Sequence, residues 1–154
     1  MSYKYDATQV NEYGLIAEGL YEVILEKAET KTLPSGKEKI GIMFRIRSDV
    51  DQAFQNRVVF EDIWKERDTE FFNRKRLNML MGTQNFENGK TFNSIAELID
   101  ALTGAFLQIN VTKSYDDYRQ EEVNGISYYR SSEHKPQTVA ETQPSDISED
   151  DIPF

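Results

Sequence analysis

Apolar and polar residues alternate along stretches in the first half of the chain, and this pattern predicts β-strands. The alternation begins at residues 19–27 (GLYEVILEK) and is clearest at residues 39–47 (KIGIMFRIR), where the apolar side chains share one face. The other face of residues 39–47 carries three cations, Lys39, Arg45 and Arg47. Because a strand has a side-chain period of two, these cations are expected side by side, away from the core.

A third stretch, residues 57–64 (RVVFEDIW), also reads as a strand but has apolar residues on both faces. One face holds Val58, Phe60 and Trp64, and the other holds Val59 and Ile63. The pattern therefore leaves open which of these two faces is turned toward the core.

A helical pattern follows the three strands. Residues 70–81 (EFFNRKRLNMLM) are good helix formers and come after Thr69, a candidate N-cap residue. Residues 95–102 (IAELIDAL) have isoleucine and leucine at helical spacing. Ser94 and Glu97 form the S-x-x-E capping box in front of this second segment, so two helices are expected.

Strand patterns return after the helices. Residues 105–113 (AFLQINVTK) alternate, and Asn124-Gly125 between two strand-like segments predicts a hairpin turn. Three strands, a helical segment and two further strands are the element order of the OB fold, a five-stranded, partly open Greek-key barrel. The sequence thus predicts an all-β domain over residues 1–130, with helices inserted between the third and fourth strands.

The composition changes at residue 131. The 154 residues carry 27 acidic and 18 basic side chains and one His, a formal net charge of -9 that argues against nucleic acid as a partner. From residue 131 onward there are six acids and one cation, so more than half of the excess lies outside the body. Residues 131–145 are rich in Ser, Thr, Gln, Glu and Pro, which predicts a flexible linker before an acidic tip, residues 146–154.

Composition also excludes several kinds of site. The absence of Cys excludes a disulfide scaffold, a thiolate nucleophile and cysteine-ligated zinc, and the single histidine, His134, excludes a multi-histidine metal site. No apolar run approaches the roughly 20 residues that span a bilayer, and the first residues lack a signal-peptide pattern. We therefore expect a cytoplasmic protein with no membrane partner.

Two acidic pairs, Asp49 with Asp51 and Glu61 with Asp62, raise the question of a metal-dependent nuclease. Such an enzyme needs several carboxylates that converge on Mg²⁺, usually with a Lys or His to handle the proton. The first pair falls in a loop after a strand, where solvated acids are common, and no Gly-rich phosphate loop is present. We expect no enzymatic activity, no cofactor and no metal site.

The end of the chain carries a separate motif, residues 146–154 (DISEDDIPF). It closely resembles the C-terminal tip of bacterial single-stranded DNA-binding proteins, which ends in Asp-Asp-Ile-Pro-Phe or a near variant. The apolar side chains of such a tip fit a pocket on a partner, its carboxylates meet cations around that pocket, and its proline stiffens the peptide. The residues expected to bind the partner are Glu149, Asp150, Asp151, Ile152, Pro153 and Phe154.

The body carries four short motifs, Gly19-x-Tyr21-x-Val23, Ser35-Gly36-Lys37, Asn56-Arg57 and Val123-Asn124-Gly125. With these motifs, residues 3–130 resemble a family of short phage-encoded single-stranded DNA-binding proteins with an OB fold. The resemblance implies a protein that coats single-stranded DNA during phage replication and recombination in the bacterial cytoplasm. The tip would recruit replication, recombination and repair enzymes, encoded by the host or the phage. The oligomeric state stays open, with a homo-oligomer as one alternative.

Sequence-independent binding of single-stranded DNA needs cations for the phosphates and aromatic rings on which bases stack. Phe60 and Trp64 qualify only if their face is outward, since a lone Trp is often a core residue. In the last strand, alternation exposes either Tyr128 with Arg130 or Tyr129, and we favour the first. The candidate DNA-binding residues are Lys39, Arg45, Arg47, Arg57, Phe60, Trp64, Tyr128 and Arg130.

A second hypothesis comes from another class of protein. An OB-fold adaptor would use the tip to capture or inhibit a host enzyme without binding DNA. The excess of acids that remains in residues 1–130 favours this alternative. Titration with oligo(dT) separates the two, because phosphate contacts give an affinity that depends on salt.

Overall fold

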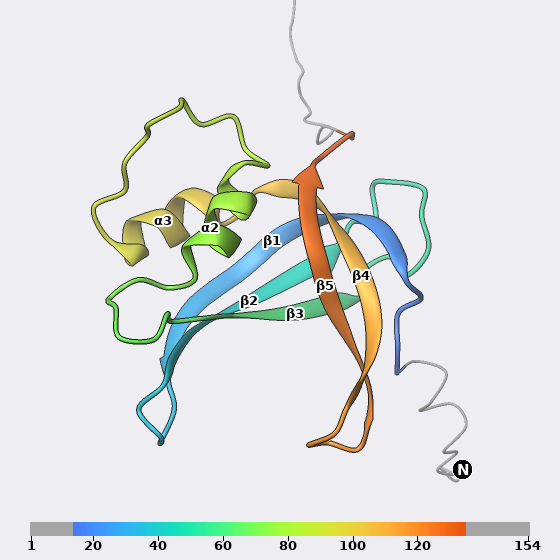
Figure 1. The fold of residues 1–154 in the computed structure, drawn as a ribbon. Coiled ribbons are helices and arrows are strands. Elements are labelled where there is room, and N and C mark those ends of the chain that lie inside the picture. Colours follow the sequence, from blue (N-terminus) through green and yellow to red (C-terminus); the bar gives the residue numbers. More distant parts are fainter. Residues whose placement is uncertain (1–13, 135–154) are drawn as a thin grey trace, which may run out of the picture.

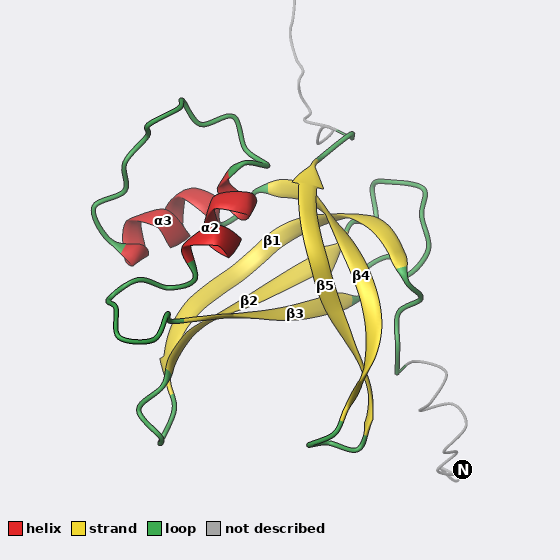
Figure 2. Cartoon of the chain, viewed as in Figure 1, coloured by secondary structure: helices red, strands yellow, loops and turns green. Residues whose placement is uncertain are grey.

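The computed structural model describes residues 14–134 of the chain, which form a mainly β fold with two helices (Figures 1 and 2). The elements are β1 (Gly19–Thr32), β2 (Glu38–Ile46), β3 (Val58–Trp64), α2 (Arg74–Met81), α3 (Ile95–Leu102), β4 (Phe106–Asp116) and β5 (Glu121–Ser131). Both helices come between β3 and β4 in the chain, and Figure 2 shows them together beside one end of the strands. Neither helix has the length and apolar character needed to cross a membrane.

The five strands form one antiparallel sheet in the order β3-β2-β1-β4-β5. β1 is therefore the central strand, and β3 and β5 are the edges. The sheet curves (Figure 1), and the edges approach each other where the Tyr129 hydroxyl of β5 donates a hydrogen bond of 2.7 Å to Glu61 of β3. Among the described strands, no backbone ladder joins β3 to β5, so the sheet is open along that line.

The predicted alternation of β2 is confirmed. The four apolar side chains on its inward face are at most 3% exposed and belong to the core: Ile40, Ile42, Phe44 and Ile46. The ambiguity of β3 is resolved, because Val59 and Ile63 point inward while Phe60 and Trp64 are exposed. The inward faces of these strands pack against buried leucines of both helices. Burying each such side chain stabilises the fold by about 1.5–3 kcal/mol relative to exposure.

The second helix begins and ends as predicted, whereas the first is shorter. Ser94 Oγ accepts a hydrogen bond from the Glu97 amide at 3.1 Å, as expected of the capping box. Helix α2 begins at Arg74 with Asn73 as its N-cap, so the prediction of Thr69 is wrong. The residues before Asn73 instead form a turn, which an isolated β-bridge between Lys65 and Phe72 closes.

The predicted hairpin turn at Asn124-Gly125 is wrong, since both residues lie inside β5 opposite β4. β4 and β5 are longer than the sequence pattern suggested, and the turn follows Asp116. The Asn124 amide instead accepts from the Ile16 amide nitrogen at 2.8 Å and donates to the Ile16 carbonyl at 2.9 Å. Asn124 thus fixes the segment that leads into β1, which is a tertiary role that no local pattern reveals.

Candidate nucleic-acid interface

The face of β1, β2 and β3 opposite the core carries exposed aromatic rings. Phe60 is 71% exposed and Trp64 is 42% exposed, so the outward orientation that their candidacy requires is met. They are four residues apart on one strand, a spacing of about 13 Å. Strand pairing places Met43 beside Phe60 and Lys39 beside Trp64. We call this surface the outer face, defined by Lys27, Glu29, Lys31, Lys39, Gly41, Met43, Arg45, Phe60, Asp62 and Trp64.

A shallow groove of about 160 Å³ crosses the outer face beside Phe60. Gly41 is part of its lining, and a Cβ atom at this position would lie 3.6 Å from the Lys31 side chain. Lys27 and Lys31 of β1 line this groove together with three acids, Glu29, Glu61 and Asp62. Lys27 pairs with Glu29 at 3.2 Å, in an exposed ion pair that is worth only about 0–1 kcal/mol. An aromatic ring therefore faces two lysines across a strip of backbone, which is the pairing of groups that a base and its phosphates require.

Lys39 lies at the other end of the outer face, next to Trp64. Its ammonium group is 5.3 Å from the centroid of the Trp64 ring and 3.1 Å from Asp62 Oδ2. Such an exposed ion pair is worth only about 0–1 kcal/mol, so exchange of Asp62 for a phosphate is energetically accessible. Lys39 thus lies where the strand pattern placed it, on the outer face, and it is beside an aromatic ring.

Arg45 is also on the outer face, but an acid already engages it. Its guanidinium donates to both carboxylate oxygens of Glu26 at 2.8 Å and to the Asn56 carbonyl at 2.8 Å. The hydrogen bond from Arg45 lowers the pKa of Glu26, and the same contact raises the pKa of Arg45. Glu26 is the extra residue of a bulge in β1, which brings its carboxylate within reach.

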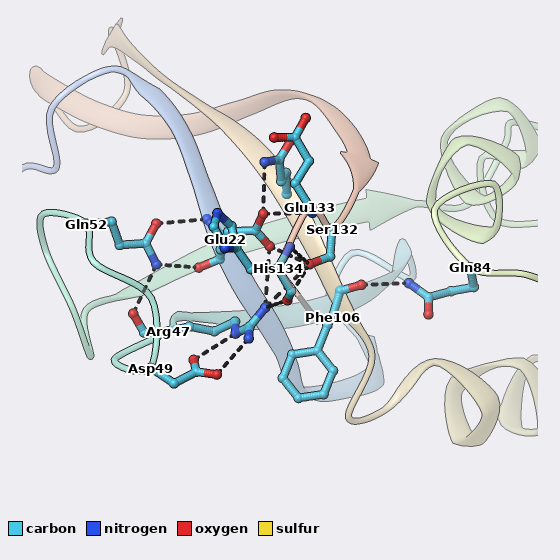
Figure 3. Close-up of polar contacts among 10 residues, drawn as sticks. Glu22, Arg47, Asp49, Gln52, Gln84, Phe106, Ser132, Glu133 and His134 are labelled. Carbon is cyan, nitrogen blue, oxygen red and sulfur yellow. Dashed lines mark hydrogen bonds and ion pairs between the residues drawn. The ribbon is translucent and has the colours of Figure 1, made fainter. Parts of the chain in front are cut away.

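Arg47 is not on the outer face, so the prediction of three aligned cations is wrong. β2 ends at Ile46, and the Arg47 amide donates to the Glu22 carbonyl at 3.0 Å, which keeps Arg47 beside β1. Contacts with Ser132 and His134, which follow β5, cover its side chain. The Arg47 side chain is 3% exposed and its guanidinium donates to Asp49 at 2.7 and 2.9 Å (Figure 3). The Phe106 ring lies 4.6 Å from its central carbon.

The buried partner of Arg47 is Glu22, whose side chain is 4% exposed. The Glu22 carboxylate also accepts from Ser132 Oγ at 2.6 Å and from the Glu133 amide at 2.9 Å (Figure 3). It accepts a further hydrogen bond from Gln108 Nε2 at 2.9 Å. A buried carboxylate is tolerated only when it is paired and hydrogen-bonded in this way. The network attaches the end of β5 to the start of β1, and its role is structural.

A second arginine, Arg76 of α2, fills the opening between β3 and β5. Its guanidinium contacts Glu61, and it donates to the carbonyls of Ile126 and of Ser127, the latter at 3.0 Å. Its central carbon lies 4.6 Å from the Tyr129 ring. Burial, together with the Glu61 carboxylate, raises the pKa of Tyr129. Arg76 therefore bridges the two edge strands.

The remaining candidates of the body, in β5 and in the loop before β3, are not part of the outer face. Tyr128 is 38% exposed, Arg130 is exposed and Tyr129 is 4% exposed, so the favoured alternation of β5 is confirmed. Tyr128 and Arg130 belong to β5, at the opposite end of the strand order from β3. Arg57 precedes β3 and lies 5.9 Å from the Phe54 ring.

The acidic pairs do not converge as a nuclease requires. Asp49 is bound by Arg47, whose hydrogen bonds lower the Asp49 pKa, and Glu61 is bound by Arg76. Within residues 14–134, no group of three or more carboxylates and histidines is placed to hold a metal ion. Asp49 and Glu61 thus balance arginines that are buried or partly buried, and Asp62 pairs with Lys39.

Comparison with known protein families assigns the chain to one family. The family model described as "Protein of unknown function (DUF669)" matches residues 3–144. The chain belongs to this family. No match was found among curated proteins. The DUF669 match covers every described strand and helix and ends before residues 146–154.

The predicted partner-binding tip of this DUF669 chain, Glu149 to Phe154, lies outside the described residues. Sequence reasoning also missed two exposed aromatics at the β4–β5 hairpin, Tyr115 and Tyr118, which are 60% and 96% exposed. They were missed because the sequence pattern placed the hairpin turn at Asn124. The structure places this turn after Asp116, next to both tyrosines. Lys31 of the outer face was missed because β1 is longer than its apolar pattern. Lys27 was missed because strict alternation places it on the face of Leu25, whereas the bulge in β1 moves it to the outer face.

Proposed function

We propose that this DUF669 chain is a sequence-independent single-stranded DNA-binding protein. The observation that carries the proposal is the pair of exposed rings on β3, Phe60 and Trp64, which face lysines of β1 and β2 across the outer face. Rings at this spacing offer stacking platforms for bases, and Lys27, Lys31 and Lys39 offer charges for phosphates.

The proposed fold behind this activity is an OB barrel. Its support is the strand order β3-β2-β1-β4-β5, together with the bridging of the two edges by Arg76 and Tyr129. In such a barrel, the surface of the second and third strands is the one that meets oligonucleotides. The outer face lies on these two strands and the adjoining part of β1.

The proposed biological setting is phage replication and recombination in a bacterial host cell. The body coats and protects single-stranded DNA, and the tip, residues 146–154, recruits DNA-processing enzymes. The support for the tip is its sequence, two apolar residues and a proline behind a run of acids at the carboxyl terminus. Deleting residues 146–154 is expected to abolish capture of those enzymes and to leave DNA binding intact.

The direct test is fluorescence anisotropy with a labelled oligo(dT), measured at low and at raised salt. Binding is expected at low salt, with log K falling linearly against log salt because phosphate contacts release counterions. A labelled duplex of the same length is the control and is expected to bind more weakly, since its bases are not free to stack. Absence of binding to oligo(dT) at low salt would reject this function and favour the adaptor hypothesis.

A further inference from the structure

A hollow of about 490 Å³ lies at the end of β3, beside Trp64. Its walls are the turn between β1 and β2, with Gly36 and Lys37, and the segment after β3, residues 65–69. This size falls in the range of about 300–1,000 Å³ that small-ligand pockets occupy. The hollow continues the line of the outer face, because Trp64 belongs to both.

Hydrogen bonds hold both walls of this hollow. The β1–β2 turn is closed by the Leu33 amide, which donates to the Lys37 carbonyl at 2.8 Å. The segment after β3 is closed by the Glu66 amide, which donates to the Phe71 carbonyl at 2.8 Å. Walls that are already ordered lose little conformational entropy when a ligand enters.

The charges of the hollow divide into paired and unpaired groups. Glu38 pairs with Lys65 at 3.0 Å, and Glu66 pairs with Arg74 at 2.8 Å. Lys37, Arg67 and Asp68 are exposed, and none of the three has an oppositely charged partner within ion-pair distance among residues 14–134. The unpaired groups of the hollow are thus two cations and one acid. Two cations are therefore available to an incoming anion without the loss of an existing pair.

A larger groove, of about 780 Å³, lies on the other side of Phe60, between β3 and the β4–β5 hairpin. Its lining holds one cation, Arg119, and four acids: Asp62, Asp116, Glu121 and Glu122. Arg119 is itself 3.8 Å from Asp116. Like charges repel a phosphate, so this groove disfavours the backbone of a nucleic acid.

We propose that the hollow beside Trp64 is a nucleotide subsite, in which a base stacks on Trp64 while Lys37 and Arg67 bind the adjoining phosphates. The strand then leaves the outer face at this end and does not pass through the acidic groove of the hairpin. This inference rests on the proposed function. It names the path of the DNA and assigns two cations that the sequence pattern did not single out.

The test compares two double variants that lose the same charges. Lys37→Ala with Arg67→Ala removes the cations of the hollow, and Lys75→Ala with Arg119→Ala removes one exposed lysine of α2 and the cation of the acidic groove. Binding to oligo(dT) is measured across a salt series for both and for the unchanged chain. Circular dichroism melts establish that each variant is folded.

The first double variant is expected to reduce the slope of log K against log salt by about 1.4, which is about 0.7 for each lost phosphate contact on a single strand. The second is expected to keep the slope of the unchanged chain. Equal slopes for the two double variants would overturn the subsite while leaving the function in place. An unchanged chain that does not bind oligo(dT) would reject the function and the subsite with it.

Discussion

Lys39 and Arg47 come from the two ends of one alternating pattern, yet they lie in opposite environments. Lys39 is on the open outer face, in a solvent-exposed pair with Asp62 and beside the Trp64 ring. Arg47 is buried with Glu22 and packs on Phe106. Alternation fixes the direction in which a side chain leaves its strand, but what covers that side chain depends on the curvature of the sheet and the path of distant segments.

The comparison separates cations that serve the fold from cations that are available to a ligand. Arg47 and Arg76 neutralise carboxylates inside the domain, so neither contributes charge to a surface. Lys27 and Lys39 of the outer face are in weak ion pairs at the surface, and Lys31 has no acidic partner within ion-pair distance among the described residues. Net charge therefore says little about nucleic-acid binding here, because the balance differs from one region to the next.

The largest expected effect is on stability and comes from removing the buried cation, Arg47. Arg47→Met leaves the Glu22 carboxylate buried without its countercharge and is expected to lower the free energy of unfolding by about 3–5 kcal/mol. Lys39→Met, the same change on the open face, is expected to cost less than about 1 kcal/mol. Urea denaturation of the two variants measures both, and equal losses would contradict the assignment of Arg47 as a structural residue.

The next largest effect is on DNA affinity and comes from removing an exposed ring of the outer face, Phe60. Phe60→Ala removes a ring that makes little contact with the core and is expected to weaken oligo(dT) binding by about 5- to 150-fold, the equivalent of about 1–3 kcal/mol for one stacked base. Tyr118→Ala, which removes an even more exposed ring at the hairpin, is the matched control and should leave affinity unchanged. Anisotropy titrations compare them, and equal losses would remove the special role of the outer face.

A smaller effect is expected where Arg76 bridges the sheet edges. Tyr129→Phe deletes the hydroxyl that donates to Glu61 at 2.7 Å and should lower the free energy of unfolding by about 1 kcal/mol. Oligo(dT) affinity should not change, because Tyr129 is buried away from the outer face. Loss of affinity with unchanged stability would show that Tyr129 belongs to the binding surface instead.

The smallest effect concerns pH. Hydrogen bonds from Arg47 lower the pKa of Asp49, so Asp49 contributes stability above its ordinary pKa of about 3.9 and loses it as pH falls through the lower, folded value. Asp49→Asn should therefore be less stable than the unchanged chain at neutral pH, with the difference shrinking in acid. Urea denaturation at several pH values measures this, and a difference that does not vary with pH would contradict it.

Local patterns were sufficient for much of the fold. The alternation of β2 and the capping box of α3 were predictable because the signals come from neighbouring residues. The turn at Asn124 was mispredicted because this side chain bonds Ile16, more than a hundred residues away in the chain. The roles of Arg47 and Arg76 could not be predicted for the same reason. Their acidic partners Glu22 and Glu61 are distant in the sequence and belong to other elements of the fold.

The candidate site was predicted in part. The exposed pair on β3 and the position of Lys39 followed from the period of a strand once the inward face was known. The hollow beside Trp64 was not predictable, because Lys37 and Arg67 belong to two loops that only the fold brings together.

The most direct test of the DNA-binding proposal uses the single tryptophan of the chain, Trp64, as its own reporter. Oligo(dT) is added at low salt while the intrinsic fluorescence of Trp64 is followed, and the titration is repeated at raised salt. The account predicts saturable quenching, because a base stacks on the ring, with an affinity that falls as salt rises. Fluorescence that stays unchanged at low salt, with no other sign of binding, would contradict the account.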